Sequence, residues 1–426
     1  MKFKKSAVVA ASVAAALMLS SCASSSGGSA SGKPEGDIEV FSWWTSGSED
    51  AALQSIIKAA EEANPGLTIT NAAVAGGGGT NSQQVLATRL SGGDIPENWQ
   101  THPGGALKDY YDQGVLTDLT DVYKSEGWDK VVPKELIDSV SFDGKNYSVF
   151  TGVHRGNVIW INKDVAAKAG VDLSGGISWD QFESAAKKIQ ATGVAPLCLG
   201  DKDIWTAAQL LESILLGELG ADKYAQLQAG KISWSDPAVL AAVDHFNTAM
   251  TYTNADHKAL DWTGAVDAFA KGTCAMNVMG DWEYGELLVK QKKVDGTDFG
   301  YAYFGDANDF LTVGDSFVVG NGSKNPAGAI AFVKAIMDPK AQLAFNKLKG
   351  SSPVRSDVDT STLGVYQQGA AKTLANGKKV PSLTHGQASV PAAVGQAYAD
   401  SVTLLEANQD AAAFGAAMDK AVKANK

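Results

Sequence analysis

Strands and helices alternate along the part of the chain that follows the N-terminal apolar segment, and this alternation limits the fold. Residues Asp37–Ser42 have the pattern of a strand, and a helix is expected to begin at Ser48. Apolar residues recur at i, i+3, i+4 and i+7 from Leu53, which is the spacing of one helix face. A second strand (Leu67–Val74) and a second helix (Asn81–Leu90) follow. The pattern predicts an α/β fold with a largely parallel sheet.

The first residues have the features of an export signal. Three lysines precede the short apolar run Ala7–Leu19, and Cys22 follows Leu-Ser-Ser. This arrangement predicts a secretory signal peptide over residues 1–21. It also resembles a bacterial lipobox, in which the Cys22 thiol is lipidated and becomes the new N-terminus. Residues 22–36 are rich in Ser and Gly and are expected to form a flexible tether. A plain secretory signal followed by a chance cysteine is the alternative.

Length and composition indicate two globular lobes. The chain has 426 residues, which is more than one hydrophobic core usually serves, even without the signal. The hydrophobic fraction is 45%, with 10 Trp and 45 Gly, which is typical of a folded chain with many loops. The net charge of −11 argues against nucleic acid as a partner. No second apolar run is long enough to span a membrane.

The later part of the chain predicts how the lobes are connected. Extended stretches near Phe150 and Val313 separate two α/β regions of similar size. We therefore expect two lobes with a ligand cleft between them, at the carboxyl ends of strands. The expected division is residues 37–150 plus 314–358 for the first lobe, and 151–313 plus 359–426 for the second. The last hundred residues are expected to be helical.

Two cysteines remain if Cys22 is lipidated. Cys198 and Cys274 would lie in an oxidising compartment, where a disulfide between them is possible. The spacing alone cannot show that they approach within bonding distance. A disulfide and two buried free thiols both stay open.

Four tryptophans stand at predicted strand or loop ends beside polar residues. Trp43 and Trp44 are adjacent, so their rings point to opposite sides of an extended backbone. Trp262 and Trp282 each follow an aspartate. Indole rings pack on the C–H faces of sugar rings, while nearby carboxylates and amides bind hydroxyl groups. Core packing is the alternative for any single one of them.

Signals for catalysis or metal binding are weak. The run Gly76–Gly79 lacks the Lys-Ser/Thr of a phosphate-binding loop, so it favours a turn or close backbone approach to a ligand. The five histidines include no pair at metal-ligand spacing, so no metal is predicted. A glycosidase pair of carboxylates cannot be excluded by counting, because the chain has many acids.

Nine segments stand in one order from about residue 38 to the C-terminus. They are Val40–Glu49, Gly76–Thr80, Gln100–His102, Val153–Asn162, Ala195–Leu197, Phe269–Trp282, Gly314–Phe317, Lys349–Arg355 and Thr384–Gly386. In sequence and in order, these segments resemble the extracellular solute-binding proteins of sugar ABC importers, and most of all the glucose/mannose-binding proteins. The family implies a two-lobed fold of the periplasmic-binding-protein type (class II).

The resemblance also implies which residues contact the sugar. Tryptophans of both lobes would enclose the ring, and polar side chains would bind its hydroxyl groups. His154 and Arg155 would support the crossing between the lobes, and Asp281 would brace Trp282 if it does not bind sugar itself. The implied ligand-binding residues are Trp43, Trp44, Glu49, Gln100, His102, Trp262, Asp281, Trp282, Asp315, Lys349 and His385.

The function implied is capture of a monosaccharide, D-glucose above all, with mannose or galactose as alternatives. The lobes would close on the sugar and the closed form would deliver it to ABC permease subunits in the membrane. The resemblance implies no catalytic residues and no cofactor, and it favours a monomer anchored by lipid outside the cytoplasmic membrane, in a periplasm or on the cell surface. The same fold with a disaccharide or another polyol is one alternative. A surface-tethered glycan hydrolase is the other, and it would consume its ligand.

Overall fold

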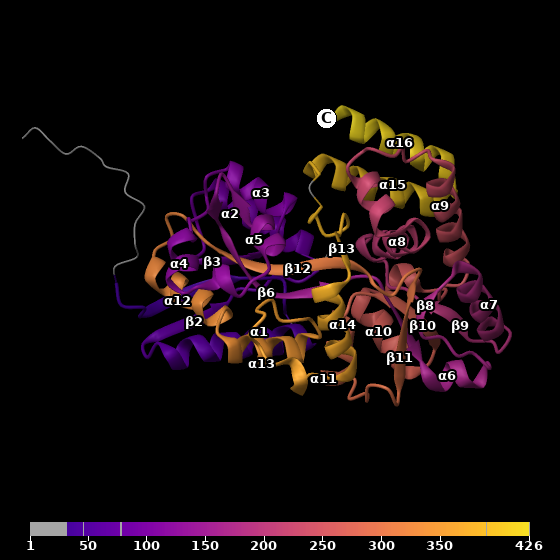
Figure 1. Cartoon of the computed structure of the whole chain (residues 1–426), viewed down its shortest axis with the longest axis horizontal. Coiled ribbons are helices and arrows are strands. Elements are labelled where there is room, and N and C mark those ends of the chain that lie inside the picture. Colours follow the sequence, from indigo (N-terminus) through magenta and orange to yellow (C-terminus); the bar gives the residue numbers. More distant parts are fainter. Residues whose placement is uncertain (1–31, 46, 77–78, 389, 426) are drawn as a thin grey trace, which may run out of the picture.

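The computed structural model describes residues 32–45, 47–76, 79–388 and 390–425. The predicted signal peptide, Cys22 and most of the predicted tether lie outside these residues. The described chain forms two α/β lobes side by side, each built around its own sheet (Figure 1). The predicted two-lobed α/β fold is therefore confirmed. No helix among the described residues is long and apolar enough to cross a membrane.

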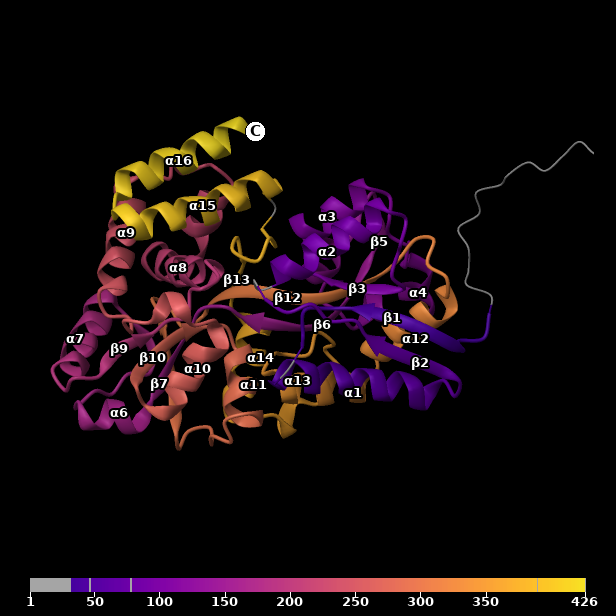
Figure 2. The same cartoon turned by 180° about the vertical axis from the view of Figure 1, so that it is seen from behind.

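The first lobe is built on a six-stranded sheet in the order β13-β12-β3-β1-β2, with β6 paired to β12. The β13 edge of this sheet reaches the second lobe, where Val380 packs in the hydrophobic cluster of that lobe. Helices α1, α12 and α13 lie on one side of this sheet, and α2, α3 and α5 lie on the other (Figures 1 and 2). The strands are β1 (Gly36–Phe41), β2 (Leu67–Asn71), β3 (Asn98–Thr101), β6 (Ser148–Arg155), β12 (Asp309–Val319) and β13 (Lys378–Pro381). The helices are α1 (Gly47–Ala63), α2 (Thr80–Ser91), α3 (Gly105–Asp112), α4 (Thr120–Ser125), α5 (Lys134–Ser139), α12 (Pro326–Ile336) and α13 (Pro339–Lys349), and a small hairpin joins β4 (Ser141–Phe142) to β5 (Lys145–Asn146).

The second lobe contains a five-stranded sheet in the order β8-β11-β7-β10-β9. The C-terminal helices α15 and α16 pack on each other and on α8 and α9. The strands are β7 (Val158–Asn162), β8 (Gly175–Ile177), β9 (Ala195–Cys198), β10 (Cys274–Met279) and β11 (Phe299–Phe304). The helices are α6 (Lys163–Lys168), α7 (Trp179–Gln190), α8 (Trp205–Gln228), α9 (Pro237–Met250), α10 (Trp262–Lys271), α11 (Trp282–Val289), α14 (Val365–Asn376), α15 (Ala392–Asn408) and α16 (Ala411–Ala424).

The local signals of the sequence account for many of these elements. The predicted apolar stripe of α1 is buried in the first lobe, and Leu53 and Ile56 are fully covered. Helix α7 begins with a capping box, in which Ser178 and Gln181 each accept a hydrogen bond from the other's backbone N–H. The prediction that the last hundred residues are helical is wrong in part, because β13 forms there and pairs with β12.

Strand direction differs from the prediction. β1 pairs in parallel with β2 and β3 as expected, but β12 runs antiparallel to β3 and β6. In the second sheet β7 runs antiparallel to both β10 and β11. Both sheets are therefore mixed rather than largely parallel. In the first sheet the long strands β6 and β12 run in opposite directions and pair with each other.

A disulfide joins Cys198 of β9 to Cys274 of β10, and 76 residues separate the two cysteines in the sequence. The two strands are parallel neighbours, with Cys198 opposite Asn277. Both cysteines are buried. The bond therefore ties together the strand that leads toward α8 and the strand that leads to α11.

Replacing both cysteines by alanine should lower the free energy of unfolding by about 2–4 kcal/mol, because the unfolded chain then loses a crosslink that closes a long loop. Urea unfolding of the exported domain measures this difference. Dithiothreitol should shift the wild-type midpoint toward that of the double variant and leave the double variant unchanged. Equal midpoints for the wild type and the variant would contradict the expectation.

Candidate functional site

A small cavity lies between the lobes, and aromatic side chains form most of its wall. Its volume is about 50 Å³, which is room for only a few water molecules. The first lobe contributes Trp43 and Trp44, and the second lobe contributes Trp205, Trp262 and Trp282. The other lining residues are Glu49, His102, Val313, Asp315, Lys349 and His385.

The three tryptophans of the second lobe share one structural position. Trp205, Trp262 and Trp282 are the first residues of α8, α10 and α11. Helix α10 is capped by Asp261, whose side chain accepts a hydrogen bond from Gly264 N at 2.9 Å. The N-terminal ends of three helices therefore meet at the cavity, each with an indole ring at its tip.

The first lobe places its two adjacent indoles differently. Trp44 has no exposed surface and packs against Phe317 and Phe345, with ring centroids 5.8 Å and 5.4 Å away. Trp43 is partly exposed and is tilted against His102, at a centroid distance of 5.2 Å. Gly79 has φ 103°, and a Cβ atom there would lie 3.0 Å from the Trp43 ring. A glycine at this position therefore lets the chain pass close behind the indole.

His385 sits on a loop that a buried carboxylate holds in place. Glu212 of α8 accepts hydrogen bonds from Leu383 N at 2.6 Å and from Ser382 Oγ at 2.8 Å. One turn earlier on the same helix, Gln209 Oε1 lies 3.0 Å from His385 Nε2. Helix α8 thus supplies Trp205 to the wall and also orients the histidine beside it.

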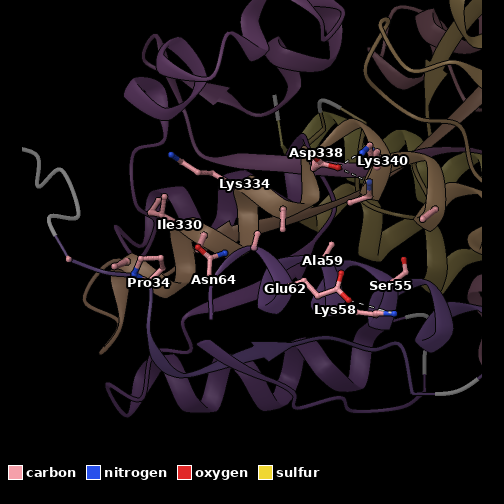
Figure 3. Close-up of a pocket in the computed structure, with 17 residues that line it drawn as sticks. Pro34, Ser55, Lys58, Ala59, Glu62, Asn64, Ile330, Lys334, Asp338 and Lys340 are labelled. Atoms are coloured by element: carbon pink, nitrogen blue, oxygen red, sulfur yellow. Dashed lines mark hydrogen bonds and ion pairs between the residues drawn. The ribbon is translucent and has the colours of Figure 1, made fainter. Parts of the chain in front are cut away.

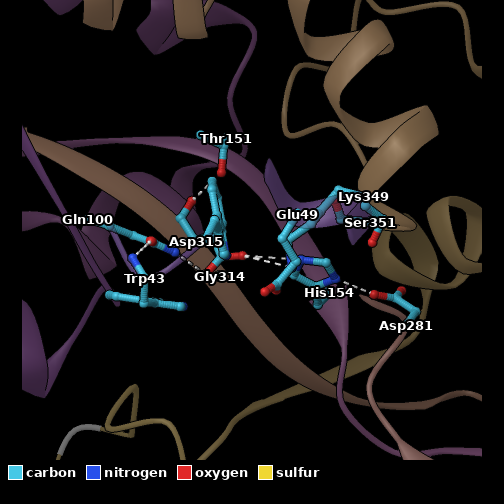
Figure 4. A network of polar contacts seen from close by, with 12 residues as sticks. Trp43, Glu49, Gln100, Thr151, His154, Asp281, Gly314, Asp315, Lys349 and Ser351 are labelled. Carbon is cyan, nitrogen blue, oxygen red and sulfur yellow. Dashed lines mark hydrogen bonds and ion pairs between the residues drawn. The ribbon is translucent and has the colours of Figure 1, made fainter. Parts of the chain in front are cut away.

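Buried charges of opposite sign line one side of the cavity (Figure 4). Lys349 is only 2% exposed, and its Nζ lies 2.6 Å from Glu49 Oε1 and 3.9 Å from Asp315 Oδ2. The same ammonium group lies over the ring of Trp44, 5.1 Å from its centroid, and 5.9 Å from that of Trp282. It therefore adds cation–π attraction to its ion pair.

His154 connects this group to the second lobe. It lies on β6, with Nδ1 hydrogen-bonded to Asp281 Oδ1 and Nε2 3.2 Å from Asp315 Oδ2. The other oxygen of Asp281 accepts a hydrogen bond from Arg155 N at 3.0 Å. His154 also meets the ring of Trp282 edge-on, at 5.3 Å between centroids. A continuous polar chain therefore runs from the cavity wall at Asp315 to the residue that precedes Trp282.

Burial and neighbouring charges both shift the pKa values of these groups. Burial, together with Lys349, lowers the pKa of His154, but Asp281 and Asp315 outweigh them and raise it above its usual 6.5. Burial would raise the pKa of Asp315, but His154 and Lys349 hold it well below its usual range. Burial lowers the pKa of His385 to about 3, and His102 adds to that shift. Burial raises the pKa of Glu49, and Lys349 opposes it.

The structure brings the predicted site residues together. All of them line the cavity except Gln100 and Asp281. Gln100 stands just behind the wall: its Oε1 accepts from Trp43 N at 3.2 Å, and its Nε2 lies 3.4 Å from Asp315 Oδ1. Asp281 contacts His154 directly before Trp282, and both of its predicted roles stay predictions.

Sequence reasoning missed two lining residues, Trp205 and Val313. Trp205 matches none of the patterns that predicted the other site residues. Its place at a helix start, like that of Trp262 and Trp282, was the signal that could have identified it. Val313 lies on β12, two residues before Asp315 and on the same strand face, but nothing in its type distinguishes it from a core valine.

Some hollows among the described residues are larger than this cavity. A cleft of about 560 Å³ adjoins it and shares His102, Trp205 and His385 as walls. A groove of about 940 Å³ lies on the outer face of the first lobe, between α1, α12 and α13 (Figure 3). The groove is lined largely by alanines and by exposed ions such as Lys58 and Glu62, and it contains none of the predicted site residues. The aromatic cavity is therefore the better candidate site.

Metal coordination does not explain the polar groups around the cavity. Among the described residues, no cluster of three or more His, Cys, Asp or Glu side chains is arranged to hold a metal ion. The buried charges of the site instead compensate one another in pairs. What remains is a surface of indole rings and hydrogen-bonding groups, which suits a neutral ligand with many hydroxyl groups.

Comparison with known proteins identifies the family. The sequence profile described as bacterial extracellular solute-binding protein matches residues 44–343. The chain belongs to this family. It is 34% identical over 354 residues to an uncharacterized ABC transporter extracellular-binding protein of Pyrococcus horikoshii, which covers 83% of this chain and 80% of the relative. It is also 34% identical over 379 residues to a probable sugar-binding periplasmic protein of Rhizobium meliloti, covering 86% of this chain and 88% of the relative.

Solved structures agree on the fold. A chitin oligosaccharide binding protein superimposes with a TM-score of 0.79 at 20% sequence identity, covering 92% of this chain and 99% of that one. At this identity the likeness concerns the fold alone. The likeness agrees with the two-lobed α/β fold.

Replacing His154 or His385 by glutamine should give stability losses with opposite pH dependence. The raised pKa of His154 gives stabilisation that is complete below pH 6.5 and is lost as pH rises through the folded-state pKa. The lowered pKa of His385 gives stabilisation that is present above pH 6.5 and is lost as pH falls toward about 3. Urea unfolding of the wild type, H154Q and H385Q across this pH range measures both trends.

The cost of H154Q should therefore shrink with rising pH, and the cost of H385Q should grow from acid to neutral pH. A cost of H154Q that is the same at every pH would show that His154 is not held as the imidazolium ion. Each variant serves as the control for the other, because both remove an imidazole near the same cavity.

Proposed function

We propose that the protein captures one sugar ring between its lobes and delivers it to an ABC importer in the membrane. D-Glucose is the proposed ligand, with mannose and galactose as the alternatives among monosaccharides. The observation that carries the proposal is the cavity itself, where indole rings from both lobes surround a few buried hydrogen-bonding groups. The family membership supports the solute-binding role, and the relative in Rhizobium meliloti supports a sugar.

The size of the cavity supports a small ligand. The enclosed volume of about 50 Å³ is far below the several hundred Å³ of common ligand pockets. A sugar therefore needs the lobes to move apart before it enters, and a single ring needs the smallest movement. A disaccharide or another polyol would have to extend into the adjoining cleft past His385.

The groups around the cavity suggest how it distinguishes sugars. Glu49 and Asp315 accept hydrogen bonds, Lys349 donates them, and the indole faces cover the C–H faces of the ring. An epimer with one hydroxyl inverted would leave a buried group unpaired, which costs about 1–3 kcal/mol. We infer binding rather than catalysis, because both carboxylates of the wall are already held by Lys349.

We propose that the two lobes move about three crossings of the chain, near Phe150, Val313 and residue 358. These crossings are the lobe limits that the sequence predicts. The β6–β12 pairing and the chain after α13 would act as the hinge. Movement of this kind exposes the cavity in the open form and encloses the ligand in the closed form. We propose that the protein works as a monomer, so that both lobes stay free to contact the permease.

Titration with D-glucose, followed by tryptophan fluorescence, tests the ligand. The soluble domain that starts after Cys22 should bind glucose with saturation and leave it chemically unchanged. W282F should weaken binding roughly tenfold, because part of the ring contact is lost. W179F is the matched control, since Trp179 and Trp282 are 7% and 6% exposed but only Trp282 lines the cavity.

Mannose, galactose and maltose are titrated in the same way. If none of the four sugars changes the tryptophan fluorescence, the monosaccharide assignment is refuted. Tighter binding of maltose than of the monosaccharides would favour the disaccharide alternative. Consumption of maltose would point to a hydrolase. Equal weakening by W282F and W179F would show that the cavity is not where the sugar binds.

We also propose that lipidation at Cys22 anchors the protein outside the cytoplasmic membrane. The wild type expressed in a bacterium should partition with detergent, because two acyl chains give stable membrane attachment. C22S should move to the aqueous phase while glucose binding by the folded domain is unchanged. Detergent partitioning with immunoblotting measures this, and an equally membrane-bound C22S would contradict the anchor.

A further inference from the structure

Helix α1 of the first lobe receives a carboxylate from the second lobe at its N-terminal end. Glu286 belongs to α11, and its Oε1 accepts hydrogen bonds from Ser48 N at 2.7 Å and from Ser48 Oγ at 3.1 Å. Glu286 is only 2% exposed, and Ser48 is fully buried. The first N–H groups of a helix have no partner within the helix and carry partial positive charge, so a carboxylate there is favourable.

Gly47, the first residue of α1, makes room for this contact. Its φ is +65°, and a Cβ atom at this position would lie 2.0 Å from Glu286 Oε1. Any side chain at residue 47 would displace the carboxylate from the helix end. The backbone of the first lobe is therefore shaped to receive a group from the second.

The Glu286–Ser48 contact and the candidate site are formed by the same two segments, the start of α1 and helix α11. Glu49, which follows Ser48, holds Lys349 at the cavity wall. Trp282 lies one helical turn before Glu286 on α11, so both side chains project from the same side of that helix. Helix α11 packs against α1 and α13 of the first lobe. It therefore presents an indole to the cavity and a carboxylate to α1 from one face.

The two lobes contribute separate hydrophobic clusters to this arrangement. Leu53 and Ile56 of α1 belong to the cluster of the first lobe. Trp282 and Leu287 of α11 belong to a cluster with Trp160 of β7 in the second lobe. The Glu286–Ser48 contact is thus made across the boundary between them, and it exists only while the lobes stand as they do here.

We propose that Glu286 is a positioning residue that stabilises the closed arrangement of the lobes by capping α1 from the opposite lobe. This inference rests on the proposed function, because it concerns how tightly the sugar is held. When the lobes separate, both the carboxylate and the helix end return to water. Apparent affinity scales with the fraction of molecules that close, so loss of the cap weakens binding without changing any group that touches the sugar.

The test compares E286Q and S48A with the wild type and with D410N. E286Q keeps the size of the side chain but removes the charge, and S48A removes one of the two hydrogen bonds. D410N is the matched control, because Asp410 caps α16 within the second lobe by accepting from Ala413 N at 2.9 Å. Each protein is examined by D-glucose titration and by small-angle X-ray scattering, without sugar and at saturation.

E286Q should raise the Kd for glucose roughly tenfold through faster dissociation, and S48A should raise it by less. Without sugar, E286Q should have a larger radius of gyration than the wild type, and at saturation the two should agree. D410N should match the wild type in both measurements. An unchanged Kd and radius of gyration for E286Q would overturn the proposal, and so would a lowered melting temperature as its only effect.

Failure of the proposed function looks different from failure of this inference. A wild type that binds no glucose refutes the ligand assignment, while scattering without sugar still compares the lobe arrangement of the wild type and E286Q. A wild type that binds glucose with E286Q unaffected refutes the cap alone. If E286Q does not fold, S48A carries the same comparison with a smaller expected effect.

Discussion

The compensation of buried charges where the lobes meet is the constraint on which the site depends. Lys349 lies between Glu49 and Asp315, and His154 lies between Asp315 and Asp281. Each of these charges would be costly to bury alone. Because they alternate in sign along β6, β12 and the ends of α1 and α13, the segments that carry them must come together for any of them to be tolerated. The geometry of the cavity follows from that requirement, since Trp44 and Trp282 pack against the same lysine.

The sequence predicted those features that rest on local patterns. The apolar stripe that begins at Leu53 defined α1, and the four tryptophans beside polar residues marked part of the cavity wall. Family resemblance supplied Glu49, His102, Lys349 and His385, which local patterns would not single out. Together these covered most of the residues that line the cavity.

Features that depend on distant pairing could not be predicted in this way. The direction of β12 is set by its pairing with β3 and β6, and no local periodicity reports it. β13 is a four-residue strand, mostly exposed, that is defined by the neighbour it pairs with. Trp205 stands at a helix start like Trp262 and Trp282, but only the folded chain shows that these three helix ends meet. The contact between Asp281 and His154 likewise became visible only in the folded chain.

The second lobe builds its share of the wall from the first residues of three helices. The side chain of a first helical residue makes few contacts within its own helix. At α10 the cap is provided by a different side chain, that of Asp261. At α10 the residue at the cavity wall can therefore be exchanged while the helix keeps its cap. Trp282 differs, because it also packs in a hydrophobic cluster of the second lobe. Only at the tip of α10 is the shape of the cavity wall thus separated from the start of the helix.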